Sequence, residues 1–176
     1  FMQFSELIDK RRSTRRFTDR KVENDTLRRI MEQALKAPSA KNTRSTRLMA
    51  VTDPAKLEAM ASMRDMGAAF LPGAAAAIVV MGDPASSPLW QINAAITATM
   101  LQLAAVDSDL SSCWVHVGDY HRIGDDPASQ RTDDYLKELL PVPPAYGILC
   151  VVALGYADYT PKPLPPYEGD ERILFA

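Results

Sequence analysis

Basic and hydroxyl side chains are concentrated in a short segment near the N-terminus. Arg11 and Arg12 are followed by Ser13 and Thr14 and then by Arg15. Guanidinium groups bind phosphate oxygens through paired hydrogen bonds, and hydroxyl groups supply further donors. The segment therefore suits a phosphate-bearing ligand, although a solvated basic surface would have the same composition.

A second segment combines small residues with an amide. Pro38 ends a predicted helix, and Ser39, Ala40 and Asn42 follow it. Small side chains let the backbone approach a flat ligand, and the Asn42 amide offers both a donor and an acceptor. This loop is the second candidate for ligand contact, and taken alone it would be an ordinary helix-ending loop.

The common nucleotide-binding and metal-binding motifs are absent from the sequence. The eight glycines form neither G-x-G-x-x-G nor G-x-x-x-x-G-K-[ST]. His116 and His121 have no Cys or carboxylate at metal-binding spacing, so no metal site is predicted. A triad could be composed from Ser112, His116 and Asp119, but triads are recognised by geometry rather than by sequence position. No catalytic side chain is therefore assigned.

The composition argues against several classes of protein. Twenty Lys and Arg stand against 22 Asp and Glu, for a net charge of -2, so no nucleic-acid partner is expected. The most apolar stretch, residues 74–81, is too short to span a bilayer, so no membrane association is expected. Cys113 and Cys150 lie in apolar runs, which predicts buried, inert thiols in a reducing, cytoplasmic compartment.

The spacing of apolar residues predicts a chain of mixed helices and strands. Helices are expected from Phe4, from Asn24 or Asp25, from Pro54, and over residues 89–106 and 135–140. Strands are expected over residues 48–51, 74–81, 113–117 and 146–154.

Three segments between or within these elements stand out. Residues 89–106 are apolar nearly all round, which indicates a helix buried in a monomer core or between subunits. Residues 118–130 form a polar loop that is long enough to be a lid or a plain surface loop. Four prolines in residues 161–166 predict that the chain continues from residue 157 as an extended arm.

Together, these segments resemble the nitroreductase family. Its members open with an R-R-S-x-R-x-[FY]-like segment and continue with A-P-S-x-x-N, which correspond here to residues 11–17 and 37–42. The resemblance extends through the end of the long helix at 101–105, Ser-Cys-Trp-Val at 112–115, and Ala-Leu-Gly-Tyr at 153–156. The motifs occur in the family order and cover most of the chain.

The resemblance implies an FMN site built by two subunits. The residues that would hold the phosphate, the ribityl chain and the N1–O2 edge are Arg11, Arg12, Ser13 and Arg15. Those that would line the flavin from the partner subunit are Pro38, Ser39, Ala40 and Asn42. Those that would border the ring system are Ser112, Cys113 and Trp114. Lys162 would complete the phosphate site, and Arg15 would stabilise the negative charge that reduction places near N1 and O2.

The implied fold is α+β, with a central, mainly antiparallel sheet flanked by helices. Residues 1–176 would form a single FMN-binding domain whose residues 157–176 are an extended arm. Family members are intertwined homodimers, and the long apolar helix and the arm are the features that such a dimer would use.

The implied reaction takes hydride from NADH or NADPH and reduces small organic acceptors such as nitroaromatics or quinones by a ping-pong mechanism. The chemistry would then reside on the flavin. Two alternatives stay open: another flavin reaction on the same fold, such as dehalogenation or dehydrogenation, and a non-catalytic phosphate- or nucleotide-binding protein.

The chain departs from the family pattern in three places. Residues 43–46 read Thr-Arg-Ser-Thr where many relatives have Gln-Pro-Trp, and residues 109–111 read Asp-Leu-Ser where relatives often have Gly-Leu-Gly. Asn93 stands where relatives frequently carry an acidic residue. We expect differences in the flavin or substrate pocket at these positions.

Overall fold

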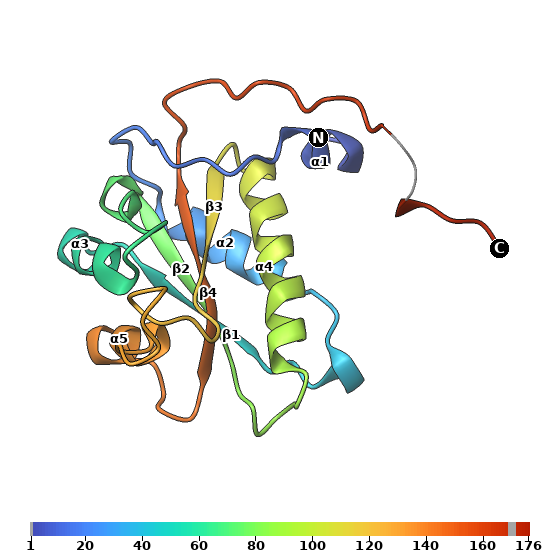
Figure 1. The fold of residues 1–176 in the computed structure, drawn as a ribbon. Helices are drawn as coiled ribbons and strands as arrows, with labels where there is room; N and C mark the ends of the chain where they lie inside the picture. Colours follow the sequence, from blue (N-terminus) through green and yellow to red (C-terminus); the bar gives the residue numbers. More distant parts are fainter. Residues whose placement is uncertain (1, 169–171) are drawn as a thin grey trace.

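Four antiparallel strands form the centre of the fold in the computed structural model, which describes residues 2–168 and 172–176 (Figure 1). They are β1 (Thr46–Val51), β2 (Ala76–Gly82), β3 (Ser111–His116) and β4 (Gly147–Gly155). The order in the sheet is β1-β2-β4-β3, so β4 lies in the interior and β3 at an edge. The predicted α+β class and antiparallel sheet are confirmed.

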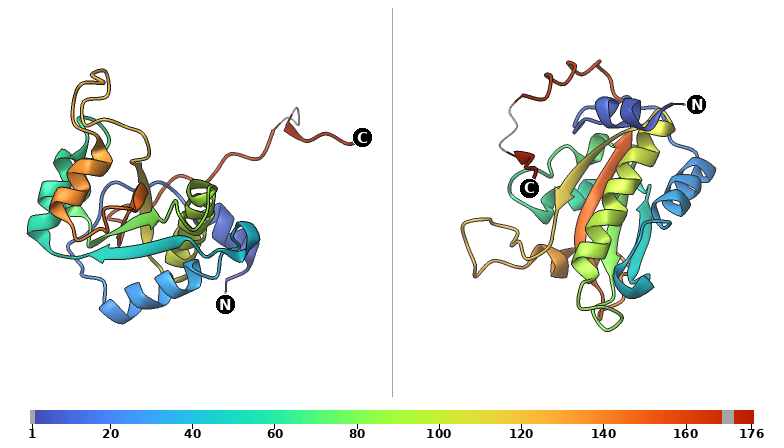
Figure 2. Two further views of the ribbon diagram at one scale, coloured as in Figure 1. Left: turned by 90° about the horizontal axis from the view of Figure 1, so that it is seen from below. Right: turned by 90° about the vertical axis from the view of Figure 1, so that its right-hand side faces the viewer.

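Helices cover both faces of this sheet. They are α1 (Phe4–Lys10), α2 (Asn24–Ala34), α3 (Pro54–Met60), α4 (Trp90–Asp107) and α5 (Thr132–Leu139), with short 3₁₀ turns at 40–42 (η1), 61–63 and 71–73. Figure 2 shows α2 on one side of the sheet and the pair α3 and α5 on the other. No helix in the described residues is long and apolar enough to cross a membrane.

The central strand β2 shows why its sequence is a continuous apolar run. Ile78 and Val80 pack with α2 and α4, whereas Val79 and Met81 pack with α3 and α5. Because both faces are covered, all seven residues of β2 are buried. The strand predicted over 74–81 is thus confirmed in substance, with its bounds shifted by up to two residues.

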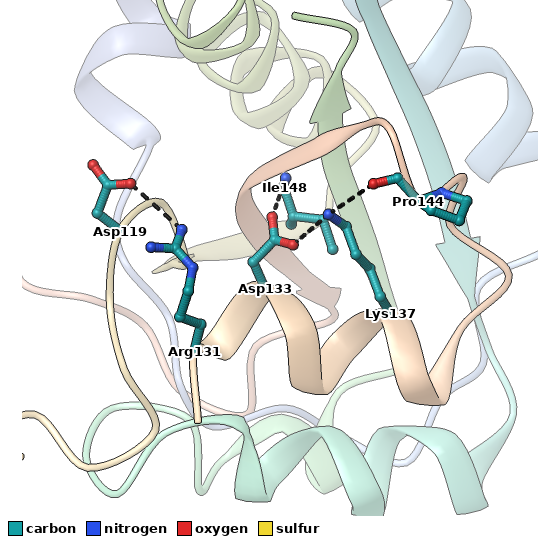
Figure 3. A network of polar contacts seen from close by, with 6 residues as sticks. All are labelled: Asp119, Arg131, Asp133, Lys137, Pro144 and Ile148. Carbon is teal, nitrogen blue, oxygen red and sulfur yellow. Dashed lines mark hydrogen bonds and ion pairs between the residues drawn. The ribbon is translucent and has the colours of Figure 1, made fainter. Parts of the chain in front are cut away.

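Helix α5 begins three residues earlier than the apolar spacing predicts, because polar side chains fix its first turn. The Thr132 hydroxyl donates to the Met63 carbonyl at 3.1 Å. Asp133 accepts the Ile148 amide at 2.8 Å and the Lys137 ammonium at 2.6 Å, which joins α5 to the start of β4 (Figure 3). The Thr132 and Asp133 side chains are buried, so polar contacts hold the start of α5 where apolar packing would otherwise do so.

Trp90 packs into a notch left by two glycines that face each other across β2 and β4. A Cβ atom on Gly82 would lie 2.6 Å from the Trp90 ring and 3.2 Å from its Cβ, and one on Gly147 would lie closer still to the ring. Gly82 and Gly147 are partners in the strand register. The notch thereby sets where α4 begins.

Gly82→Ala is expected to lower the free energy of unfolding by about 1–3 kcal/mol, because the added methyl group must displace Trp90. Thermal or urea unfolding measures the change. Gly73→Ala is the matched control, since a Cβ there meets no atom within 4 Å, and it should change stability by less than about 0.5 kcal/mol. Equal effects of the two substitutions would contradict the notch.

One face of α4 is not covered by the sheet. Ile92, Ile96 and Met100 follow one another at intervals of four residues, and all three are exposed. Leu89, three residues before Ile92, is exposed on the same face of the helix. On the other side of the helix, Asn93, Thr97 and other residues are buried. The expectation of burial all round therefore fails for the single chain, and an apolar stripe of Leu89, Ile92, Ile96 and Met100 is left open to solvent.

Candidate functional site

The arginine-rich segment crosses the end of the sheet beside β3. Ser13 forms a parallel bridge with Ser112, and the Thr14 amide donates to the Ser112 carbonyl at 2.9 Å. Further along, the Thr18 amide donates to the Tyr156 carbonyl at 2.7 Å. Backbone hydrogen bonds thus fix the segment to β3 and to the residue that follows β4, although no regular strand is predicted for it.

Phe17 fixes the far end of the same segment. Its ring lies over Gly155, where a Cβ atom would come within 2.7 Å of the ring. The ring also packs at 6.5 Å, centroid to centroid, from Phe70 in the core on the α3 side. A glycine at the end of β4 is therefore required for the segment to approach the sheet this closely.

Alternation along the segment separates exposed from buried side chains. Ser13 and Arg15 are exposed, whereas Thr14 is 1% exposed and points inward. Within the described residues, the buried Thr14 hydroxyl has no hydrogen-bond partner. Thr14 also borders a cavity of about 200 Å³, which Lys10, Arg12 and Asp109 line as well.

Arg11, Ser13 and Arg15 gather around the thiol of Cys113. Burial raises the pKa of Cys113, while Arg15, a hydrogen bond with Ser13, and Arg11 oppose the rise. Within the described part of the chain, neither Arg11 nor Arg15 forms an ion pair. Arg11, Ser13 and Arg15 therefore lie near Cys113 on β3.

Arg12 is held differently from its neighbours. Its guanidinium donates to the carbonyls of Asp9 at 2.6 Å and Arg11 at 2.8 Å, and to that of Lys162 at 3.4 Å. These contacts join the exit of α1 to the arm and place the Lys162 backbone beside Arg12. The structure thus gives Arg12 a positioning role as well as a positive charge.

Ser112 and Trp114 lie on the face of β3 that is directed at α4. Ser112 is 1% exposed and accepts a hydrogen bond from the Gln102 amide at 3.3 Å. The Trp114 indole donates to Nδ1 of His116 at 3.3 Å, and the two rings stack at 10°. Because an indole can only donate, Nδ1 of His116 must be the acceptor.

Sequence reasoning left a cluster at the end of β3 unassigned. Arg64 donates to the His116 carbonyl at 3.3 Å and lies 4.4 Å over the ring of Tyr120. Tyr120 in turn meets His116 edge-on at 5.1 Å. The only sequence signal was that His116 follows Trp114 by two residues and so shares its face of the strand.

The His116 imidazole should be neutral in the folded protein near pH 7. Burial lowers its pKa below 6.5, Arg64 lowers it further, and Asp119 opposes the change. The unfolded chain therefore binds the proton first, and stability should fall as the pH drops from 6.5 toward the lowered pKa. His116→Gln should remove this slope in urea titrations at several pH values; an unchanged slope would contradict the assignment.

The loop of the second predicted group is held by Asn93, far from the arginine segment. Asn93 is 1% exposed; its Oδ1 accepts the Ala40 amide at 2.9 Å, and its Nδ2 donates to the Ser45 hydroxyl at 2.9 Å. The Ser39 hydroxyl accepts the Arg44 amide at 2.9 Å. An amide at position 93 therefore serves as both acceptor and donor, a combination that a carboxylate does not offer.

Left-handed backbone conformations occur in the loop after Pro38 and before β3. Lys41, Asn42 and Arg44 have φ values of 52°, 53° and 48°, and Asp109 has 59°. Such angles cost a non-glycine residue about 1 kcal/mol or more. Asp109 therefore adopts a conformation that glycine adopts readily.

A single chain does not bring the two groups of predicted residues together. Asn93, which holds Ala40, and Gln102, which contacts Ser112, are about 13 Å apart along α4 at 1.5 Å per residue. Figure 1 shows η1 and α1 at opposite ends of this helix. Pro38, Ser39, Ala40 and Asn42 therefore lie at one end of α4, and the arginine segment lies at the other.

The fold is that of an α+β protein in which Arg11, Ser13 and Arg15 lie near Cys113 on the edge strand β3. The sequence matches the Nitroreductase family over residues 8–71 and 56–156. The chain belongs to this family. In the described residues, no group of three or more His, Cys, Asp or Glu side chains is placed to hold a metal ion.

Comparisons with individual proteins agree with the family assignment. A protein of Archaeoglobus fulgidus, provisionally named an NADH dehydrogenase/NAD(P)H nitroreductase, is 32% identical over 95% of this chain and 91% of its own length. The structure of the FMN-dependent nitroreductase of Clostridium difficile R20291 superimposes with a TM-score of 0.87 and 34% identity, covering 96% of each chain. The structure of a Bacteroides thetaiotaomicron protein, also provisionally named an NADH dehydrogenase/NAD(P)H nitroreductase, superimposes with a TM-score of 0.85 and 26% identity. It covers 97% of this chain and 95% of its own.

Proposed function

We propose that the protein is an FMN-dependent oxidoreductase that takes hydride from NADH or NADPH and reduces small organic acceptors such as nitroaromatics or quinones, in ping-pong order. The observation that carries this proposal is the convergence of Arg11, Ser13 and Arg15 at β3 in a chain of the nitroreductase family. The FMN dependence of the Clostridium difficile relative supports the choice of cofactor.

The residues at β3 fit the chemical groups of FMN. Arg11 and Lys162 would hold the phosphate, and the hydroxyl of Ser13 would bind the ribityl chain. Arg15 would lie at the N1–O2 edge, where its charge stabilises the reduced cofactor. Bound FMN would supply the hydride and electron transfer itself, so that the protein needs to bind, orient and shield rather than provide an acid–base pair.

The apolar stripe on α4 supports a homodimer. Ile92 and Leu89 are 56% and 45% exposed, which is unfavourable for a row of adjacent aliphatic side chains in water. A two-fold axis perpendicular to α4 would pack the stripe against its copy with the two α4 helices antiparallel. The N-terminal end of one α4 would then lie beside the C-terminal end of the other.

Such a dimer would complete the flavin site. The loop with Pro38, Ser39, Ala40 and Asn42 is attached to the N-terminal end of α4, and the β3 site lies by the C-terminal end. Antiparallel packing therefore carries this loop of one subunit to the β3 site of its partner, as the family resemblance implies. Each site would contain residues of both chains.

The C-terminal arm supports the same assembly. It leaves the sheet through a bridge between Phe17 and Ala157 and an ion pair of 3.0 Å between Arg16 and Asp158. From there the described residues run past α1 and away from the sheet (Figure 1). Leu164 and Tyr167 on the arm are exposed. We infer that they pack on the surface of a second subunit. Residues 169–171 of the predicted arm lie outside the described residues.

We also infer a reducing, cytoplasmic location. Cys113 and Cys150 are buried free thiols, and burial raises the pKa of Cys150. Thiols in this state pack as small apolar groups and are not poised to form disulfides.

An absorption spectrum tests the proposed function. The purified protein is mixed with FMN, desalted, and then titrated anaerobically with NADH and, separately, NADPH. Retained yellow colour that bleaches with either nucleotide is expected. A protein that stays colourless after desalting would overturn the flavin assignment and favour a non-catalytic, phosphate-binding role.

A further inference from the structure

We propose that the loop of residues 39–47 selects anionic substrates, with Lys41 and Arg44 binding a carboxylate or phosphate on the molecule that reacts at the flavin. This inference rests on the proposed function, because the loop meets a substrate only where it lines the flavin of the partner subunit.

The loop carries an excess of positive charge. Residues 36–52 contain Lys36, Lys41, Arg44 and Arg47 and no acidic residue, and all four basic side chains are exposed. Arg47 is partly offset by Asp83, whose pKa is lowered mainly by a hydrogen bond with Ser86 and in small part by Arg47. Among the described residues, Lys41 and Arg44 form no ion pair. Their charges are therefore available to a ligand.

The two cations are held in place by an ordered and strained loop. Both have left-handed φ values, and the loop is fixed by the Asn93 hydrogen bonds and by that between Ser39 and the Arg44 amide. The Arg44 guanidinium also donates to Oδ1 of Asn42 at 3.2 Å. Strained backbone persists where the surroundings enforce it, and such strain is concentrated in binding sites.

The position of the loop gives these charges a substrate-side role. Lys41 and Arg44 flank Asn42, one of the residues proposed to line the flavin from the partner. The anionic groups of the cofactor already have Arg11, Arg15 and Lys162 at the β3 site. The charges of the loop would therefore act on the reacting molecule, which is either the nucleotide donor through its 2′-phosphate or the acceptor through a carboxylate.

The test removes the two charges without disturbing the backbone. Asparagine tolerates left-handed φ better than most residues, so Lys41→Asn with Arg44→Asn keeps the loop conformation. Lys56→Gln is the control: it removes one exposed cation from α3, away from the loop. FMN content and thermal unfolding of each variant are measured first.

Two pairs of substrates then distinguish the sources of the anion. The donor arm compares kcat/KM for NADPH with that for NADH, and the acceptor arm compares 4-nitrobenzoate with nitrobenzene. In the double variant, we expect kcat/KM for the more anionic substrate, divided by kcat/KM for the less charged one, to fall roughly tenfold in at least one arm. In the parent protein the same ratio should fall when ionic strength rises from about 0.01 M to about 0.1 M.

The outcomes separate this inference from the function on which it rests. A fall confined to the donor arm assigns the loop to the nucleotide phosphate, and one confined to the acceptor arm assigns it to the acceptor's carboxylate. Unchanged ratios in a double variant that keeps its FMN would overturn the inference alone. A parent protein that fails to hold FMN, or that neither nucleotide reduces, would overturn the proposed function and the inference with it.

Discussion

Replacing Arg11 and Arg15 together by alanine is expected to weaken FMN binding at least about 100-fold, which corresponds to about 2.7 kcal/mol. Each guanidinium would supply a charge-assisted hydrogen bond to an anionic part of the cofactor, and such bonds contribute about 1.5–3 kcal/mol. Both side chains are at least partly exposed and form no ion pair with the residues that the structure describes, so their removal leaves no buried ionic partner there unsatisfied. The fold should therefore persist, and the loss should be specific to FMN.

Flavin fluorescence titration measures this change directly, since bound and free FMN differ in emission. The control is Arg28→Ala, which removes one exposed arginine from α2 on the sheet face opposite α3 and α5. It should leave the FMN dissociation constant within about twofold. Full retention of FMN by the double variant would refute the assignment of the β3 site.

The second large effect is expected from Ile96→Glu, which places a charge in the centre of the α4 stripe. If the stripe packs against its copy, each dimer would bury two carboxylates without partners, at a cost of several kcal/mol. We expect the dissociation constant of the dimer to rise by about three orders of magnitude. FMN should be lost with it, because each site would lack the loop from the other subunit.

Sedimentation and FMN content together test this prediction. Gln91→Glu introduces the same charge into the same helix at an exposed position outside the stripe, and it should remain dimeric and yellow. A monomeric parent protein that binds FMN fully would contradict the shared site. An Ile96→Glu variant that stays dimeric would show that another surface forms the interface.

The sequence by itself determined the elements whose signals are local. The apolar run at 74–81 specified a strand covered on both faces, since each face of β2 packs on a helical layer. The arginine and hydroxyl segment predicts a phosphate site from composition alone, and this stays a prediction. Such patterns depend on residues within about one helical turn or along one strand, so they can be read without knowing the fold.

Only the tertiary structure decided which of these segments meet. Asn93 bonds to Ala40 across 53 positions of the sequence, and Thr132 bonds to Met63 across 69. Both pairs use polar side chains that are buried, and apolar periodicity carries no signal for them. The same limit explains why the start of α5 and the conformation of the 39–45 loop were not predicted.

The division of the candidate site also follows from the tertiary structure. Composition marks residues 89–106 as apolar, but only the packing of α4 on its own sheet separates a buried face from the exposed stripe of Leu89, Ile92, Ile96 and Met100. The two predicted halves of the site then lie at opposite ends of that helix. A linear sequence specifies the order of its motifs, whereas their separation in space depends on long-range packing between elements that are distant in the chain.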